Sequence, residues 1–148
     1  NLRYVKLNNT VYTIQDVYYP LLSSHFSTLV SLDLLPADSS LEKLVLLNQT
    51  ISKDKNGLWK SSTDISADLI NKTIEHWLHD QAFGIHQYMP REQLGEVILY
   101  LTNQPPVSYI ITDTEPWLII ARPDIGLEYH LQTEAYNKLI SPLDLNEK

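Results

Sequence analysis

The sequence of 148 residues contains no cysteine and only four glycines. Without cysteine the chain cannot form a disulfide, use a thiol nucleophile or bind a metal through thiolates. The glycines stand singly, so no glycine-rich loop is present that could hold a phosphate group. The absence of cysteine fits a reducing cytosol better than a small secreted fold, and we expect a cytoplasmic location.

Long hydrophobic runs are also missing. No apolar run approaches the roughly 18 residues of a membrane-spanning helix, and no signal peptide is recognisable, so we expect a soluble protein that does not enter a membrane. The length suits one domain with a sizeable core, and the sequence has no internal repeat and no long linker. We therefore predict a single domain over residues 1–148, in which residues 144–148 form a loose tail.

Negative charge is concentrated in the second part of the chain. Residues 1–63 hold six Lys/Arg and five Asp/Glu, a net charge of +1, whereas residues 64–148 hold five and thirteen, a net charge of −8. Such an acidic surface repels the phosphates of a duplex and attracts basic protein surfaces. The charge distribution makes nucleic acid an unlikely partner and permits a basic protein as one.

The clearest helical pattern runs from Ser66 to Phe83. Apolar side chains recur on one face at helical spacing, at Ile70, Ile74, Trp77 and Leu78. Thr63, Asp64 and Ser66 each offer a capping oxygen at its start, and Gly84 follows its end. We expect this helix to lie on the core.

The polar face of this helix carries His76, His79 and Asp80, and His86 follows shortly after. These residues could form a metal-dependent or acid–base site, which is our alternative to a binding function. Their order, Glu-His-Trp-Leu-His-Asp, matches no zinc motif with a physical rationale. A solvated helix face explains them more simply, so we predict no metal site, no cofactor and no catalytic residue.

Further helices are expected at four places. Apolar periodicity, prolines and a capping pattern predict them over residues 20–32, 40–48, 91–102 and 133–140. The segment over 40–48 is apolar nearly all round, so it is either a deeply buried helix or a strand.

Strand signals occupy the rest of the chain. Residues 2–7 and 10–14 form a predicted hairpin that turns at Asn8 and Asn9, because asparagine tolerates a positive φ angle. Three β-rich runs over 107–112, 117–122 and 127–132 predict an antiparallel meander. The fold class predicted from these patterns is α+β, with four to five helices, an N-terminal hairpin and a C-terminal three-stranded antiparallel meander.

A second hairpin is predicted between residues 50 and 63, around Asn56 and Gly57. Its lysines, Lys53, Lys55 and Lys60, suggest a nucleic-acid binder, which is our second alternative. The acidic remainder of the chain opposes this interpretation, and the following segment lacks room for the turn of a helix-turn-helix motif.

The function that the sequence favours is that of a small acidic protein-binding module. Inhibitors, toxin-neutralising or immunity proteins, adaptors and chaperones of this size would all fit, with a basic macromolecule as the partner. The outward residues of the meander and its acidic turn are the predicted partner-binding residues: Asp113, Glu115, Glu128 and His130. Tyr109, Trp117 and Tyr129 are candidate aromatic anchors, although we expect Trp117 and Tyr129 to pack in the sheet.

Overall fold

A computed structural model describes residues 2–15 and 29–143. They belong to two compact units, one ending at Val30 and a main unit beginning at Ser31, and each is described by itself. The single domain expected over residues 1–148 stays a prediction. Of the helix expected over 20–32, residues 20–28 lie outside the described residues and 29–32 form no helix. The tail expected at 144–148 also lies outside them.

The N-terminal unit contains the predicted hairpin. Strands β1 (Leu2–Leu7) and β2 (Thr10–Gln15) pair antiparallel, with Leu7 opposite Thr10 next to the turn. Asn8 has a φ angle of 55°, the left-handed conformation that a tight turn requires. The prediction of this hairpin from its two asparagines is confirmed.

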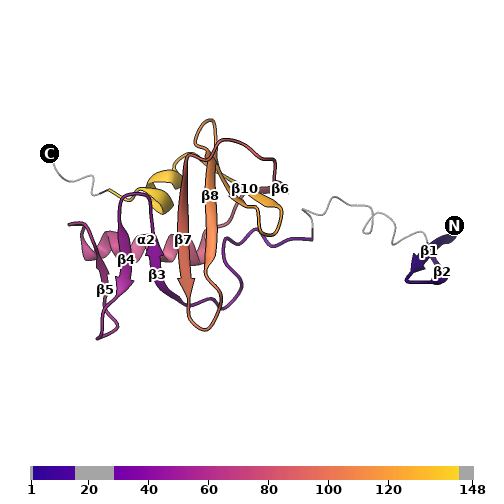
Figure 1. Ribbon diagram of the computed structural model, residues 1–148, viewed down its shortest axis with the longest axis horizontal. Helices are drawn as coiled ribbons and strands as arrows, with labels where there is room; N and C mark the ends of the chain where they lie inside the picture. The colour runs from indigo at the N-terminus through magenta and orange to yellow at the C-terminus, as the bar shows by residue number, and fades with distance from the viewer. Residues whose placement is uncertain (1, 16–28, 144–148) are drawn as a thin grey trace. The chain divides into compact units, whose positions relative to one another are not determined.

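The main unit is built on an eight-stranded antiparallel sheet, ordered β5-β4-β3-β7-β8-β9-β10-β6 (Figure 1). Its strands are β3 (Leu41–Val45), β4 (Thr50–Lys53), β5 (Trp59–Ser61), β6 (Gly84–Gln87), β7 (Gly95–Leu101), β8 (Val107–Asp113), β9 (Leu118–Arg122) and β10 (Leu127–Leu131). The predicted meander corresponds to β8, β9 and β10, and the predicted lysine hairpin to β4 and β5.

The predicted fold class is wrong, because the protein is mostly β. In the described residues only one substantial helix is present, α2 (Ala67–His79), beside a short π-helix, η3 (Tyr136–Ile140), where an ordinary helix was expected over 133–140. The helices expected over 40–48 and 91–102 are strands β3 and β7. In β7 the buried residues Val97, Leu99 and Leu101 alternate along the chain, which is the period of a strand and not of a helix.

Helix α2 begins as expected and ends early. The Ser66 hydroxyl accepts a hydrogen bond from the Leu69 N–H at 3.2 Å, and Ile70, Thr73, Ile74 and Trp77 are buried. The helix was predicted to reach Phe83, but Asp80 is extended and Gln81 forms a bridge with Asp33. Backbone pairing therefore replaces the last helical turn, and the expected connector after Gly84 is strand β6.

The core lies between one face of the sheet and α2. Trp77 is completely buried, its ring centroid is 5.7 Å from that of Tyr109 in β8, and its indole N–H donates to the Leu139 carbonyl of η3 at 3.0 Å. The Tyr109 hydroxyl in turn donates to the Leu34 carbonyl. These contacts fasten α2 and η3 to the middle of the sheet and leave its other face to the site described below.

The capping hydroxyl of Ser66 gives a first testable prediction. Replacing Ser66 with alanine leaves the Leu69 N–H without this acceptor and should lower the free energy of unfolding by about 1 kcal/mol. Ser66→Asp should retain most of the stability, because aspartate caps helices equally well. Urea unfolding followed by circular dichroism measures both. Equal losses in the two variants would contradict a capping role.

Candidate functional site

The structure brings the predicted partner-binding residues to one end of the sheet. Asp113, at the end of β8, lies opposite Ile119 of β9, and Ile119 lies opposite His130 of β10. Glu128 is two residues before His130 on the same face, and Glu115 is in the turn that follows β8. The clustering follows from the antiparallel register, which alternation of residue types alone does not determine.

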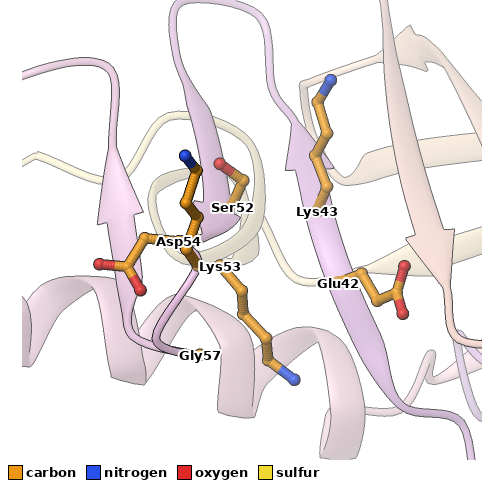
Figure 2. A pocket seen from close by; sticks show the side chains of 7 residues that line it. Glu42, Lys43, Ser52, Lys53, Asp54 and Gly57 are labelled. Atoms are coloured by element: carbon orange, nitrogen blue, oxygen red, sulfur yellow. The ribbon is translucent and has the colours of Figure 1, made fainter.

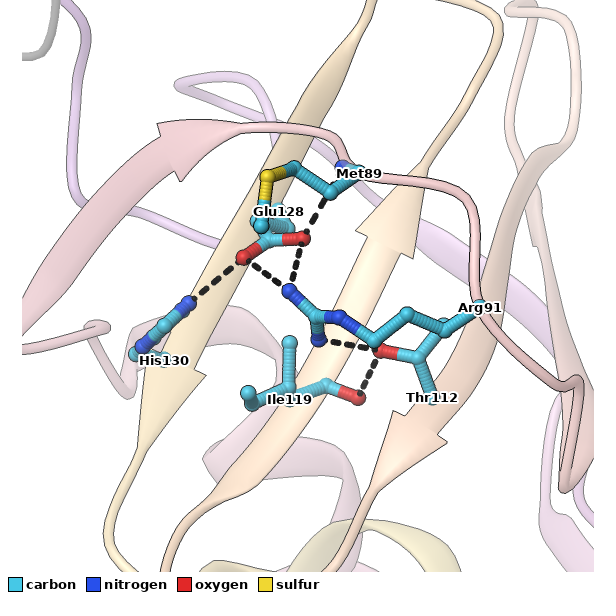
Figure 3. A network of polar contacts seen from close by, with 6 residues as sticks. All are labelled: Met89, Arg91, Thr112, Ile119, Glu128 and His130. Atoms are coloured by element: carbon cyan, nitrogen blue, oxygen red, sulfur yellow. Dashed lines mark hydrogen bonds and ion pairs between the residues drawn. The ribbon is translucent and has the colours of Figure 1, made fainter.

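The alternating pattern of β10 predicted that the Glu128 side chain faces solvent, but Glu128 is buried. Only 3% of its surface is accessible, so the expectation of an outward, solvent-facing carboxylate is wrong. The segment that follows β6 covers it, and Figure 3 shows Met89 and Arg91 of this segment next to the Glu128 carboxylate, each joined to it by a dashed line. Glu128 can therefore act on a partner only through the residues it holds.

The buried carboxylate is the centre of a polar network (Figure 3). Arg91 Nη2 lies 2.7 Å from Glu128 Oε1 and 2.9 Å from Oε2, and His130 Nε2 lies 2.9 Å from Oε1. The Met89 N–H donates to Oε2 at 3.3 Å. Arg91 Nη1 also donates to the Thr112 hydroxyl at 3.4 Å. The Thr112 hydroxyl donates in turn to the Ile119 carbonyl of β9 at 3.4 Å, so the network ties β8, β9 and β10 to the covering segment.

These contacts decide the charge of the buried group. Burial alone raises the pKa of Glu128, but hydrogen bonds from His130, Arg91 and the Met89 backbone outweigh it, and the pKa lies below its ordinary value. Glu128 is consequently an anion at neutral pH. A carboxylate held in this way fixes the orientation of the His130 ring, because it occupies one of the two ring nitrogens.

An aromatic cluster surrounds His130. We call Phe83, His86, Trp117 and His130 the ring cluster. The centroid distances are 4.5 Å between His86 and His130, 5.7 Å between Phe83 and Trp117, 6.3 Å between Phe83 and His130, and 6.4 Å between Trp117 and His130. Phe83 and Trp117 remain 48% and 44% exposed. Phe83 and Trp117 thus contact each other and His130 while about half of each side chain stays accessible to solvent.

The sequence identified part of this cluster. Of the candidate anchors, Tyr109 and Tyr129 are buried, and Trp117 packs against Phe83 and His130 yet stays open on its outer side. Phe83 and His86 were missed, because they were assigned to a helix end and a connector. The alternation of Ile85 inward and His86 outward in β6 was the available signal, but four residues are too few for a firm periodicity.

The helix histidines are not brought into a common site. His76 Nδ1 lies 2.9 Å from the Asp80 carboxylate and His79 Nε2 lies 3.2 Å from the Glu75 carboxylate, each pair one turn apart along α2. His86, the suggested additional ligand, contacts His130. Within residues 2–15 and 29–143, no group of three or more potential ligands is arranged to hold a metal ion.

The lysine hairpin borders an open pocket of about 500 Å³. Figure 2 shows Lys43 and Lys53 on its walls with their amino groups pointing away from each other. Lys60 is 3.8 Å from the Asp54 carboxylate, and the Lys53 amino group lies 5.1 Å from the centre of the Trp59 ring. The amino groups do not converge on a common point where a phosphate could bind.

Comparison with known proteins supplies no relative. No family model matches the chain, and neither the curated proteins nor the solved structures contain a significant match. In the part of the chain that the structure describes, no helix combines the length and the apolar character needed to cross a membrane. The function has to be inferred from the chain's own geometry.

Proposed function

We propose that this protein is a small acidic protein-binding module that engages a basic macromolecular partner through the ring cluster and the adjacent acidic turn. The observation that supports this most is the exposure of Phe83 and Trp117 in a cluster of rings that contact one another on the sheet face opposite α2. Exposed aromatic side chains with fixed positions are enriched among the residues that dominate binding energy, since little conformational freedom is lost when they are covered.

The buried network supports the same proposal. Arg91 and Glu128 form an ion pair beside His130, and Glu128 orients the His130 ring, which contacts the other three rings. A binding surface needs such a supporting layer to hold its contacting side chains in one geometry. The ring cluster therefore has the preorganisation of a recognition surface.

The acidic turn supplies the charge. Asp113 and Glu115 stand four and two positions before Trp117, and Asp113 Oδ1 accepts hydrogen bonds from the Thr114 and Glu115 N–H groups at 2.8 and 3.2 Å. The Asp113 carboxylate is thus fixed in place, while Glu115 is exposed. Carboxylates at the rim of an aromatic surface favour a basic partner and accelerate its association.

Affinity capture with matched variants tests this function. The tagged chain is used as bait in an extract of its native source at low and moderate salt, and retained proteins are quantified by mass spectrometry. We expect a basic protein to be retained by the wild type and lost from Phe83→Ala/Trp117→Ala, because its aromatic contact is removed. Asp113→Asn/Glu115→Gln should retain less of the basic partner, and the difference in retention between low and moderate salt should become smaller.

The matched control removes two charges elsewhere. Asp38→Asn/Asp64→Asn changes the net charge by the same amount at exposed positions outside the site and should retain the partner as the wild type does. Thermal unfolding of each variant confirms that the fold is intact. If all four proteins retain the same set of partners, the ring cluster and the acidic turn are not the binding surface.

A further inference from the structure

Two accessible aromatic rings of the main unit outside the ring cluster each have a lysine amino group over them. The Lys43 amino group lies 5.2 Å from the centre of the Tyr100 ring, and the Lys53 amino group lies 5.1 Å from that of Trp59. Among the described residues, Phe83 and Trp117 make no such contact. An indole is the ring that attracts a cation most strongly, so Trp117 offers an unused place for one.

Carboxylates lie within reach of the same ring. Glu115 is separated from Trp117 by one residue, so their Cα atoms are at most about 7 Å apart. Asp113, at the end of β8, is held by backbone N–H groups of the same turn. A partner's cation that contacts the Trp117 ring would therefore lie close to the part of the chain that carries these two carboxylates.

Arginine fits this combination better than lysine. Its guanidinium is planar and can stack on an indole while its edge donates hydrogen bonds to a carboxylate. A lysine ammonium is compact and strongly hydrated, and it cannot stack. The site supplies both a flat ring and carboxylate acceptors in the adjacent turn, and an arginine can use both at once whereas a lysine cannot.

We propose that the ring cluster and the acidic turn bind an arginine side chain of the partner, stacked on Trp117 and paired with Glu115 or Asp113. This inference rests on the proposed function and specifies the partner's contacting residue. The partner is then a protein that presents an exposed arginine at its interface, and a lysine at that position is bound less tightly.

Oligoarginine and oligolysine of equal length are the probes, titrated against the full chain by isothermal calorimetry at low salt. We expect oligoarginine to bind about two- to fivefold more tightly, because a guanidinium can stack on the indole and pair with a carboxylate at the same time, whereas an ammonium cannot stack. Trp117→Ala should remove this preference while leaving charge-driven binding of both peptides. Tyr100→Ala, which removes an accessible ring outside the site, should keep the preference.

The outcomes separate the inference from the proposed function. Equal affinities for the two peptides, unchanged by Trp117→Ala but reduced by Asp113→Asn/Glu115→Gln, would overturn arginine recognition and leave a basic-partner surface intact. Binding of neither peptide, or binding reduced equally by Asp38→Asn/Asp64→Asn, would overturn both. A preference for oligoarginine that persists in Trp117→Ala would also overturn the stacking proposed here.

Discussion

Replacing Arg91 with methionine should destabilise the protein by about 3 kcal/mol at neutral pH, one of the two largest effects expected of a single substitution. The reason is the position of Glu128, which is 3% exposed and loses its partner at 2.7 Å. Desolvation of an unpaired carboxylate is costly, and the remaining donors, His130 and the Met89 N–H, only partly offset it. Urea unfolding at neutral pH measures the loss.

A second substitution identifies the cause of this loss. Glu128→Leu, added to Arg91→Met, removes the unpaired charge and should recover most of the stability, because apolar side chains of similar volume often replace a buried ion pair without loss. If the double variant is no more stable than Arg91→Met, the loss comes from packing of the arginine side chain and not from the buried charge.

The same pair makes wild-type stability depend on pH in a defined direction. The pKa of Glu128 in the folded protein lies below the ordinary value of 4.5. Its contribution to stability is therefore fully present above pH 4.5 and is lost as the pH falls through the lower folded pKa. In Arg91→Met/Glu128→Leu this part of the acid sensitivity should be absent, which unfolding curves collected across the acidic range would show.

Replacing Trp77 with alanine should cost about 3–5 kcal/mol, the other large effect. Trp77 is completely buried, stacks at an angle on Tyr109, and its indole N–H satisfies the Leu139 carbonyl. The substitution leaves a cavity between α2 and the sheet and an acceptor without its donor. Chemical denaturation monitored by far-ultraviolet circular dichroism measures the effect independently of the lost fluorophore.

Trp77→Phe is the informative companion variant. Phenylalanine keeps much of the ring volume but cannot donate to Leu139, so the loss should be smaller than that of Trp77→Ala and should include about 1 kcal/mol from the hydrogen bond. An effect of Trp77→Ala below about 1 kcal/mol would show that α2 does not fasten the core as its contacts indicate.

The sequence predicted the segments whose signals are local. Asn8 and Asn9 specify the first hairpin, and apolar spacing from Ile70 to Trp77 specifies α2. Strands β3 and β7 were misassigned because a short apolar run has helical and extended spacings at the same time, and neighbouring strands decide between them. In β7, Leu99 lies opposite Leu44 of β3, a pairing across more than fifty positions that no local pattern contains.

The candidate site was predictable to the same limited extent. Alternation in β10 correctly placed Glu128 and His130 on the face away from Tyr129, but it could not show that the segment between β6 and β7 covers that face. Arg91 and Glu128 are 37 positions apart, and their pairing depends on where β6 adds to the sheet. Burial of an ionisable group is a property of the assembled sheet.

The strand order has a consequence for how the molecule opens. β3, β4 and β5 are consecutive along the chain, β7 to β10 are consecutive as well, and among the described strands the two groups pair through β3 and β7. Cooperative opening units tend to follow such locally connected groups, so this seam is where hydrogen exchange should divide the sheet. The ring cluster and its ion pair belong entirely to the second group and its attached segments. A transient opening of the seam would therefore expose backbone amides of β3 and β7 while the ring cluster kept its shape.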